Sequence, residues 1–229
     1  MKFGIIGAMA LETKLLIEKM DHAQEKSVAG MLFFEGKINH HDVVIVTSGV
    51  GKVNAAACTQ ILISEFKVQK LINTGVSGAI HEDLDVGDIV ISVDCLEHDF
   101  DVTAFGYKFG MIPSLGDSVF AADSDLIEKA YSAGKEELTN HQIYKGRVVS
   151  GDQFVSSSER KTFIKEHFDA MTTEMEGAAI AHVAVLNQVP FVVIRSISDK
   201  ADGSAHVIYD EFVLEAAKHS ANIVLKMLG

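Results

Sequence analysis

Two neighbouring stretches in the last third of the chain carry the side chains best suited to chemistry. Glu174 and Glu176 lie two residues apart in a short β-leaning run. Because side chains alternate along an extended strand, this spacing directs both carboxylates to one side. The apolar run 191–194 predicts a strand buried on both faces, and Arg195 and Asp199 follow it. Each residue alone is an ordinary polar end to a strand, but together they predict a site with three carboxylates and one guanidinium.

A helix is predicted between these two stretches. Residues 177–186 are rich in alanine and place apolar side chains at helical spacing, and Asn187 and Pro190 end the pattern. A strand, a helix and a second strand in this order form a β-α-β unit, in which the carboxyl ends of the strands meet at one edge of the sheet. This unit would bring the acids and Arg195 together.

A fourth carboxylate, Glu12, is predicted near the start of the chain. Residues 3–7 form a β-leaning run that ends at Gly7, and a helix is expected over residues 11–19. A carboxylate in the first turn of a helix is favoured by the helix dipole. Glutamates are common at helix starts, so this position alone indicates little about function.

The glycine-rich residues 48–52 fail two nucleotide-binding patterns. A phosphate-binding loop needs Gly at position 46 and Ser or Thr at position 53, and both are valine. A dinucleotide fingerprint needs Gly at position 54, which is Asn54, so a nicotinamide-dependent dehydrogenase is disfavoured. What remains is a strand-to-helix turn that brings backbone N–H groups close to a ligand. Residues 74–79 are interpreted as another small-residue turn, and Ser77 there lacks the frame of a nucleophile elbow.

Strands and helices alternate along the 229 residues, which predicts an α/β fold in one domain, residues 1–229. Strands are expected over residues 3–7, 31–35, 43–47, 70–73, 88–93, 144–149 and 191–194, and helices over residues 11–19, 53–66, 125–138, 158–168, 177–186 and 209–228.

The composition favours a protein that acts on a small molecule. A net charge of −12 argues against nucleic acid or an anionic membrane as a partner, because either needs a basic face. No segment approaches the length of a membrane span, and the N-terminus lacks the features of a signal peptide. Cys58 and Cys95 stand in apolar surroundings and are interpreted as small buried hydrophobes in a reducing, cytoplasmic environment.

Two loops hold further candidates. His98, Asp99 and Asp101 suggest a metal site, but the other histidines are scattered and no cysteine is near. We therefore expect no metal and interpret His98 as structural. Phe154 follows the strand 144–149, where a phenylalanine either packs in the core or stacks on a flat ligand.

Nine short motifs, taken in order, give the chain a resemblance to the bacterial 5′-methylthioadenosine/S-adenosylhomocysteine nucleosidases of the nucleoside phosphorylase superfamily. They span essentially the whole length: GIIGAM followed by Glu12, SGVGKVNAA, INTG, VGDIVIS, HDFDVTAFGY, SGDQF, EMEGAAIAH, PFVVIRSISD and DEF. The resemblance implies a three-layer α/β/α fold with a central mixed twisted sheet. It also implies hydrolysis of the N-glycosidic bond of both nucleosides, releasing adenine and the 5-thioribose product, with no cofactor.

The resemblance assigns roles residue by residue. Asp199 matches the general acid that protonates N7 of adenine, and Glu12 matches the acid that activates the attacking water. Such chemistry needs two carboxyl groups in opposite protonation states at one pH. The other matched positions form the substrate site: Glu176 with Met175 for the ribose hydroxyls, Glu174 and Arg195 for the water, Phe154 and Val155 for the base, Ser198 for support of the acid, Met9, Val50 and Tyr209 for the 5′-thioalkyl group, and Gly78.

The resemblance also implies a homodimer, since Val102 and Phe105 match a segment that a second subunit contributes to the pocket. The chain departs from the family pattern in three places. Val76 and Ser77 stand where the family has serine and then alanine, Glu97 replaces an aromatic residue, and Tyr209 replaces phenylalanine.

Two other functions stay open at this stage. A nucleoside phosphorylase of the same fold would use phosphate in place of water, but phosphate sites favour arginine forks. The chain has only three arginines, Arg147, Arg160 and Arg195, and none follows the first strand. A non-catalytic nucleoside-binding or futalosine-type protein is disfavoured by the intact set of acids. The preference among methylthioadenosine, adenosylhomocysteine, deoxyadenosine and aminodeoxyfutalosine is not indicated by the sequence.

Overall fold

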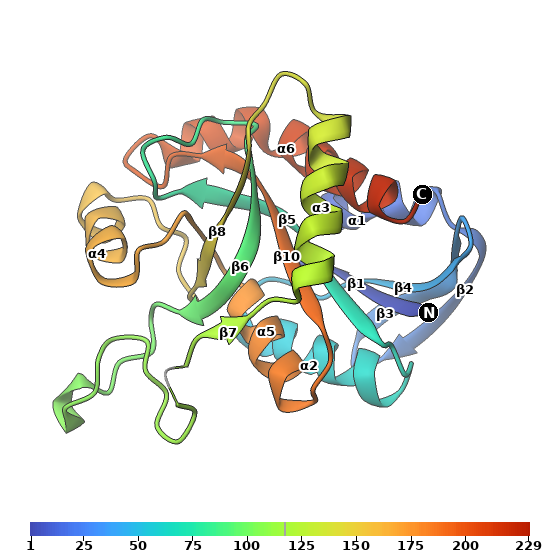
Figure 1. The fold of residues 1–229 in the computed structure, drawn as a ribbon, viewed down its shortest axis with the longest axis horizontal. Coiled ribbons are helices and arrows are strands. Elements are labelled where there is room, and N and C mark those ends of the chain that lie inside the picture. Colours follow the sequence, from blue (N-terminus) through green and yellow to red (C-terminus); the bar gives the residue numbers. More distant parts are fainter. Residues whose placement is uncertain (117) are drawn as a thin grey trace.

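The computed structural model describes residues 1–116 and 118–229 and contains one mixed β-sheet with helices on both faces (Figure 1). The strands of the described residues are β1 (Lys2–Gly7), β2 (Asp21–Val28), β3 (Met31–Ile38), β4 (His41–Thr47), β5 (Lys70–Ala79), β6 (Ile89–Glu97), β7 (Phe120–Ala121), β8 (Ile143–Ser150), β9 (Thr172–Glu174) and β10 (Phe191–Asp199). The predicted α/β class with a central mixed sheet is confirmed.

Helices α1, α3 and α6 cover one face of the sheet, and α2 and α5 pack together on the other (Figure 1). Their bounds are α1 (Ala10–Glu18), α2 (Lys52–Ser64), α3 (Ser124–Glu137), α4 (Ser158–Phe168), α5 (Gly177–Leu186) and α6 (Ala205–Met227), with a short 3₁₀ turn, η1 (Thr103–Phe105). Aliphatic side chains of the sheet alternate between the two faces and fill a separate core under each group of helices.

Part of the sheet closes on itself. Strand β10 pairs in parallel with β5 and antiparallel with β6, and β8 and β9 complete a ring of five strands back to β5. Strands β1, β4, β3 and β2 extend the sheet from β5. Closure brings the ends of β5, β9 and β10 around one space, whereas an open sheet would spread them along an edge.

One predicted turn and the residues predicted to follow one strand belong to longer strands instead. Residues 74–79 continue β5, and residues 195–199 continue β10, so Arg195, Ser198 and Asp199 lie in the strand and not after it. The prediction was wrong because it ended each strand where small or polar residues begin. In the closed ring these residues pair with each other, as Arg195 does with Gly75 and Ser196 with Val76.

The strands β2 and β7 were not predicted, and α6 begins at Ala205, four residues before the predicted start. Strand β2, DHAQEKSV, is exposed along almost all of its length, so it shows no alternation of apolar and polar side chains. Its pairing with β3 at the end of the sheet is what keeps it extended.

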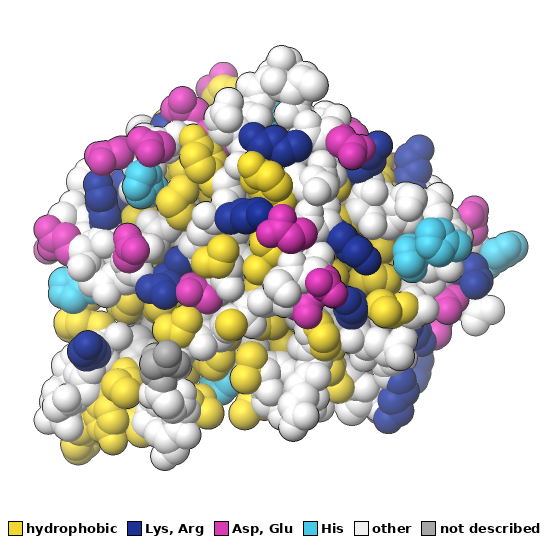
Figure 2. Space-filling view, viewed as in Figure 1, with side chains coloured by type: hydrophobic (Ala, Val, Ile, Leu, Met, Phe, Trp, Pro, Cys, Tyr) yellow, Lys and Arg dark blue, Asp and Glu magenta, His cyan; other side chains and the backbone are white. Residues whose placement is uncertain are grey.

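The segment 98–116, which follows β6, projects from the body of the molecule (Figure 1). Hydrophobic side chains gather over it at the lower left of Figure 2, and its Phe105 is 81% exposed. Elsewhere on this face Lys and Arg are interspersed with Asp and Glu (Figure 2).

Among the described residues, no helix combines the length and the apolar character that crossing a membrane requires. Cys58 and Cys95 are buried and unpaired.

Candidate active site

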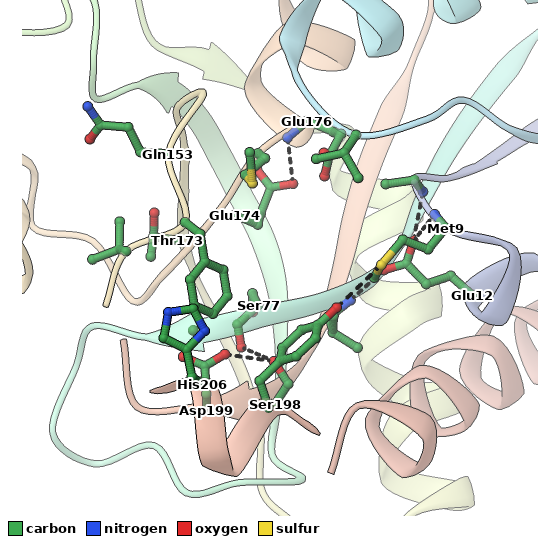
Figure 3. A pocket seen from close by; sticks show the side chains of 18 of the residues that line it. Met9, Glu12, Ser77, Gln153, Thr173, Glu174, Glu176, Ser198, Asp199 and His206 are labelled. Atoms are coloured by element: carbon green, nitrogen blue, oxygen red, sulfur yellow. Dashed lines mark hydrogen bonds between the residues drawn. The ribbon is translucent and has the colours of Figure 1, made fainter. Parts of the chain in front are cut away.

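A cavity of about 340 Å³ opens where the five-stranded ring meets the start of α1 and the first turns of α6. Figure 3 shows Glu12 and Asp199 on different sides of this hollow, with Glu174 and Glu176 along a third side. The structure places twelve of the predicted site residues in its lining: Met9, Glu12, Val50, Gly78, Phe154, Val155, Glu174, Met175, Glu176, Ser198, Asp199 and Tyr209.

Glu12 is held by backbone N–H groups at the junction of β1 and α1. Its Oε2 accepts from Ala8 (2.7 Å) and Met9 (2.8 Å), and its Oε1 accepts from Val76 in β5 (3.1 Å). Burial raises the pKa of Glu12, while Arg195 and the three N–H groups oppose that rise. A carboxylate whose pKa lies above its ordinary value is a better proton acceptor near neutrality than an exposed glutamate.

Arg195 lies beneath the cavity and is 1% exposed. Its Nη2 donates to Glu174 and to Asn73 Oδ1 (2.6 Å). Nη2 is 3.7 Å from Glu176 Oε2, and Nη1 is 4.0 Å from Glu12 Oε1. One guanidinium therefore lies within 4.0 Å of three buried carboxylates. We call these four residues, Glu12, Glu174, Glu176 and Arg195, the carboxylate cluster.

A glycine makes this cluster possible. Gly75 pairs with Arg195 across β5 and β10. A Cβ at position 75 would overlap both the Arg195 guanidinium and the Glu12 carboxylate. The INTG motif is thus explained by the close approach of two charged side chains over the strand.

Glu174 and Glu176 are positioned by the start of α5. Strand β9 ends at Glu174, whose carboxylate accepts the N–H groups of Glu176 (3.0 Å) and Gly177 (2.9 Å) and a hydrogen bond from the Ser150 hydroxyl. Glu176 accepts the N–H of Gly51 (2.8 Å). Burial and the neighbouring Glu174 raise the pKa of Glu176 to about 8, so this side chain holds a proton at neutral pH.

Asp199 ends β10 on another side of the cavity. Its Oδ1 accepts the N–H of Ala201 (2.8 Å), and its Oδ2 accepts the Ser198 hydroxyl (2.9 Å). Burial raises the pKa of Asp199, and these two hydrogen bonds oppose the rise. A Cβ at Gly78 would lie 2.9 Å from Asp199 Oδ1, so glycine at this position leaves room for the carboxyl group.

Aromatic rings form the wall beside Asp199. The Phe154 ring lies 5.1 Å from the ring of His206, tilted by 37°, and 5.7 Å from the ring of Tyr209 in an edge-on arrangement. Phe154 is 42% exposed, whereas Val155 is buried. A partly open aromatic face of this kind can stack on a planar base.

The end of the cavity near Met9 is apolar. The Tyr209 hydroxyl lies 3.3 Å from the Met9 sulfur, and both residues pack against Val76 and Val213. Val50 lines the same cavity and is 48% exposed. This end offers a thioether and aliphatic surface to a ligand.

Several lining residues were not identified as site residues from the sequence: Ala8, Val76, Ser77, Gln153, Thr173, His206 and Asp210. His206 and Asp210 lie on α6 near Tyr209. An earlier start for that helix would have placed His206 one turn before Tyr209, whereas Asp210 already lay in the predicted helix. Val76 and Ser77 both face the cavity. The Ser77 hydroxyl accepts a hydrogen bond from Thr172 (2.6 Å), which fixes the hydroxyl that differs from the family pattern.

Three predicted residues do not line the cavity of this chain. Arg195 lies behind it, and Val102 and Phe105 lie on the projecting segment.

His98 is buried, with its Nδ1 2.9 Å from Arg160 Nη2, and burial lowers its pKa to about 4. Within residues 1–116 and 118–229, no group of three or more His, Cys, Asp or Glu side chains is arranged to hold a metal ion.

The geometry can support acid-assisted cleavage of a sugar–base bond. Asp199 is a buried carboxyl group beside an aromatic wall that suits a planar base, and the carboxylate cluster faces the same cavity. Buried carboxylates stabilise a cationic sugar in the transition state.

Known proteins resemble this chain over its whole length. The model of the phosphorylase superfamily matches residues 2–229. A relative from Staphylococcus carnosus (strain TM300), named 5′-methylthioadenosine/S-adenosylhomocysteine nucleosidase, is 44% identical over 226 residues, which are 98% of each chain.

Two solved structures are also similar to this chain. The nucleosidase of the same name from Neisseria meningitidis, in complex with methylthio-immucillin-A, is 41% identical with a TM-score of 0.95, covering 99% of this chain and 97% of that chain. The futalosine hydrolase of Helicobacter pylori strain 26695 is 34% identical with a TM-score of 0.93, covering 99% and 96%.

Proposed function

Since this chain belongs to the phosphorylase superfamily, we propose that it is an enzyme that hydrolyses the N-glycosidic bond of 5′-methylthioadenosine and S-adenosylhomocysteine. The products are adenine and the 5-thioribose compound. The observation that carries the proposal is the cavity that has Glu12 and Asp199 on different sides, in a chain whose full-length relatives are named for this activity.

Asp199 is the general acid of the proposed reaction. Adenine leaves readily only when N7 takes up a proton, so the acid must still be protonated near neutrality. Burial raises the pKa of Asp199, which supports this role. The proton moves from Asp199 to N7 as the bond from C1′ of ribose to N9 breaks, and the base departs neutral.

Glu12 is the general base. A water molecule attacks C1′ and gives its proton to Glu12, so that the proton lost by Asp199 is matched by the one gained at Glu12. Glu174 orients this water, and Arg195, which lies behind the cavity, acts through its bond to Glu174. The ionised members of the cluster stabilise the oxocarbenium ion. Proton exchange with solvent then returns both carboxyl groups to their starting states.

The remaining lining residues hold the substrate. Glu176 binds the ribose hydroxyls beside Met175, and Phe154 and Val155 take the base. Ser198 supports Asp199 through its hydroxyl, while Gly78 leaves space at that carboxyl group. The apolar end near Met9, Val50 and Tyr209 receives the 5′-thioalkyl group.

The same proposal includes a homodimer in the cytoplasm. Val102 and Phe105 would enter the cavity of the partner, next to its thioalkyl end. The exposure of Phe105 (81%) and Val50 (48%) supports this arrangement, since exposed apolar surface at a cavity mouth favours a covering partner. Light scattering that gives the mass of one chain at micromolar concentration would exclude it. The buried, unpaired Cys58 and Cys95 suit a reducing compartment.

The rival reaction is phosphorolysis. Phosphate sites favour arginine forks, and Arg195 is buried beneath the cavity and occupied by carboxylates. The test is release of adenine from each thio-nucleoside, with and without phosphate. We expect equal rates in both buffers, and a strict need for phosphate would reverse the assignment. Parallel assays with deoxyadenosine and aminodeoxyfutalosine would define the substrate range.

A further inference from the structure

Three residues outside the cavity lining form a closed ring of hydrogen bonds. The backbone N–H of Lys52 donates to Asp152 Oδ1 (2.8 Å), and the backbone N–H of Asp152 donates to Asp99 Oδ2 (2.9 Å). The Lys52 ammonium closes the ring by donating to Asp99 Oδ1 (2.7 Å). We call Lys52, Asp99 and Asp152 the anchoring ring. It ties together the start of α2, the end of β6 and the loop after β8.

Glu97 strengthens the ring. It is 8% exposed and accepts a second hydrogen bond from the Lys52 ammonium (2.7 Å). Burial alone would lower the pKa of Lys52, but the bonds to Asp99 and Glu97 outweigh it and raise that pKa. Glu97 is also the residue that replaces an aromatic side chain of the family pattern, so this chain adds a charge partner to the ring.

On one side, the ring fixes the backbone that holds Glu176. Helix α2 begins at Lys52, and its N-cap, Gly51, offers no side chain to the free N–H groups of the first turn. Asp152 supplies that cap from 100 residues away in the sequence. With Lys52 fixed, the Gly51 N–H points at Glu176 Oε1, and the adjacent Val50 is held at the cavity.

On the other side, the ring fixes the wall for the base. Asp152 directly precedes Gln153, Phe154 and Val155, and the segment between β8 and α4 has no regular secondary structure. Its backbone therefore depends on individual bonds, and two of these are made by Asp152. Loss of the ring would free Phe154 to move relative to Asp199.

We propose that the anchoring ring is a positioning device that sets the distance between the ribose side of the cavity, at Glu176, and the base wall, at Phe154. The proposal rests on the function assigned to the cavity above. Lys52, Asp99 and Asp152 act through Gly51 and Phe154 and do not touch the substrate.

The ring governs binding more than the chemical step. Glu12 is held by Ala8, Met9 and Val76, and Asp199 by Ser198 and Ala201. None of these bonds involves the ring. A variant without the ring therefore keeps the acid and the base in place and loses contacts made by bound substrate, which raises KM while kcat changes little.

The first test replaces Lys52 with methionine, which keeps the length of the side chain and removes its charge. We expect KM for methylthioadenosine to rise about tenfold and kcat to fall about threefold or less, since misplacement of a binding wall costs substrate affinity. The control is Lys145→Met, because Lys145 also bonds a carboxylate, Glu128, but lies on the surface away from the cavity. An unchanged KM in Lys52→Met would overturn the proposal.

The second test separates positioning from stability. Asp152→Ala removes the acceptor for the Lys52 N–H, whereas Asp152→Asn retains an oxygen in that place. We expect a KM rise in the alanine variant and recovery of most of it in the asparagine variant. Asp123→Ala removes the N-cap of α3, lowers stability in the same way as loss of the α2 cap, and leaves KM unchanged. Equal KM values in Asp152→Ala and Asp123→Ala would contradict the proposal, even if Lys52→Met fails to fold. Absence of adenine release by the unmodified enzyme would instead refute the proposed function.

Discussion

Two carboxyl groups on different sides of the cavity are buried with different partners: Glu12, at what we call the water end, and Asp199, at the acid end. At the water end, Glu12 accepts three backbone N–H groups and lies 4.0 Å from the Arg195 guanidinium. At the acid end, Asp199 accepts one N–H and one hydroxyl. Among the described residues, no cationic nitrogen lies within 4 Å of its carboxyl group. Burial raises the pKa of both. Glu12 has a guanidinium 4.0 Å away and three N–H groups that favour its ionised form, whereas Asp199 has one N–H, one hydroxyl and the more distant Lys161 ammonium.

This difference shows how one small cavity can hold an acid and a base at the same pH. The water end concentrates charge of both signs, and its excess of carboxylates is relieved by the proton on Glu176. The acid end has no ion pair of this kind among the described residues, so less opposes the burial that raises the pKa of Asp199. Burial raises the pKa of both carboxyl groups, and the cation and dipoles that oppose it are more numerous at Glu12, which distinguishes the base from the acid.

Removing the cation from the water end is expected to have the largest effect. Arg195→Met leaves the cluster's carboxylates buried without their guanidinium, and breaking a buried ion pair in this way costs about 3–5 kcal/mol. The control is Arg147→Met, because Arg147 pairs with Asp94 at 2.7 Å but is 27% exposed, and such a pair contributes about 1 kcal/mol. Urea unfolding measures both variants. Equal midpoints would show that Arg195 does not hold the cluster together.

A pH series sharpens the comparison at Glu176. Its folded-state pKa of about 8 lies above the ordinary value of 4.5, so between these values the folded protein holds a proton that the unfolded chain releases. Glu176 therefore makes the free energy of unfolding fall as pH rises from 5 to 8, against the opposite contribution of His98, whose pKa burial lowers to about 4. Glu176→Gln should reduce this fall without abolishing it, because the raised pKa of Asp199 contributes in the same direction. Identical slopes for the two proteins would contradict the assignment of the proton to Glu176.

The smallest effect is expected at the apolar end. Tyr209→Phe removes the hydroxyl that contacts the Met9 sulfur at 3.3 Å, and a thioether is a weak acceptor. The ring remains, together with its packing against Phe154. We expect kcat/KM for both thio-nucleosides to change by about threefold or less. A loss of tenfold or more would mean that this hydroxyl contacts substrate.

The sequence predicted the helices and the acids near the cavity because their signals are local. Helices α4 and α5 have the predicted bounds, since each has a clear start and stop. Glu174 and Glu176 do face one cavity, but alternation along a single strand does not explain it. Strand β9 ends at Glu174, and Glu176 is the N-cap of α5, so a strand end and a helix start together aim the two carboxylates.

Features that depend on distant pairing could not be predicted in this way. The closure of β10 against both β5 and β6 extends β5 through the predicted turn 74–79 and β10 through residues 195–199. The cap that Asp152 gives to α2 joins residues 100 positions apart, and neither partner shows an unusual local pattern. His206 was missed because the start of α6 was placed too late.

The most direct test of the central claim compares two leaving groups in the variants Asp199→Asn and Glu12→Gln. One substrate is methylthioadenosine, whose base needs a proton to depart. The other is the 4-nitrophenyl glycoside of the same thioribose, whose leaving group departs as a stable anion. Asp199→Asn should lose about 10² to 10⁴ in kcat with methylthioadenosine and retain most of its rate with the nitrophenyl compound, whereas Glu12→Gln should lose activity on both. Equal losses on the two substrates in Asp199→Asn would contradict the assignment of Asp199 as the acid.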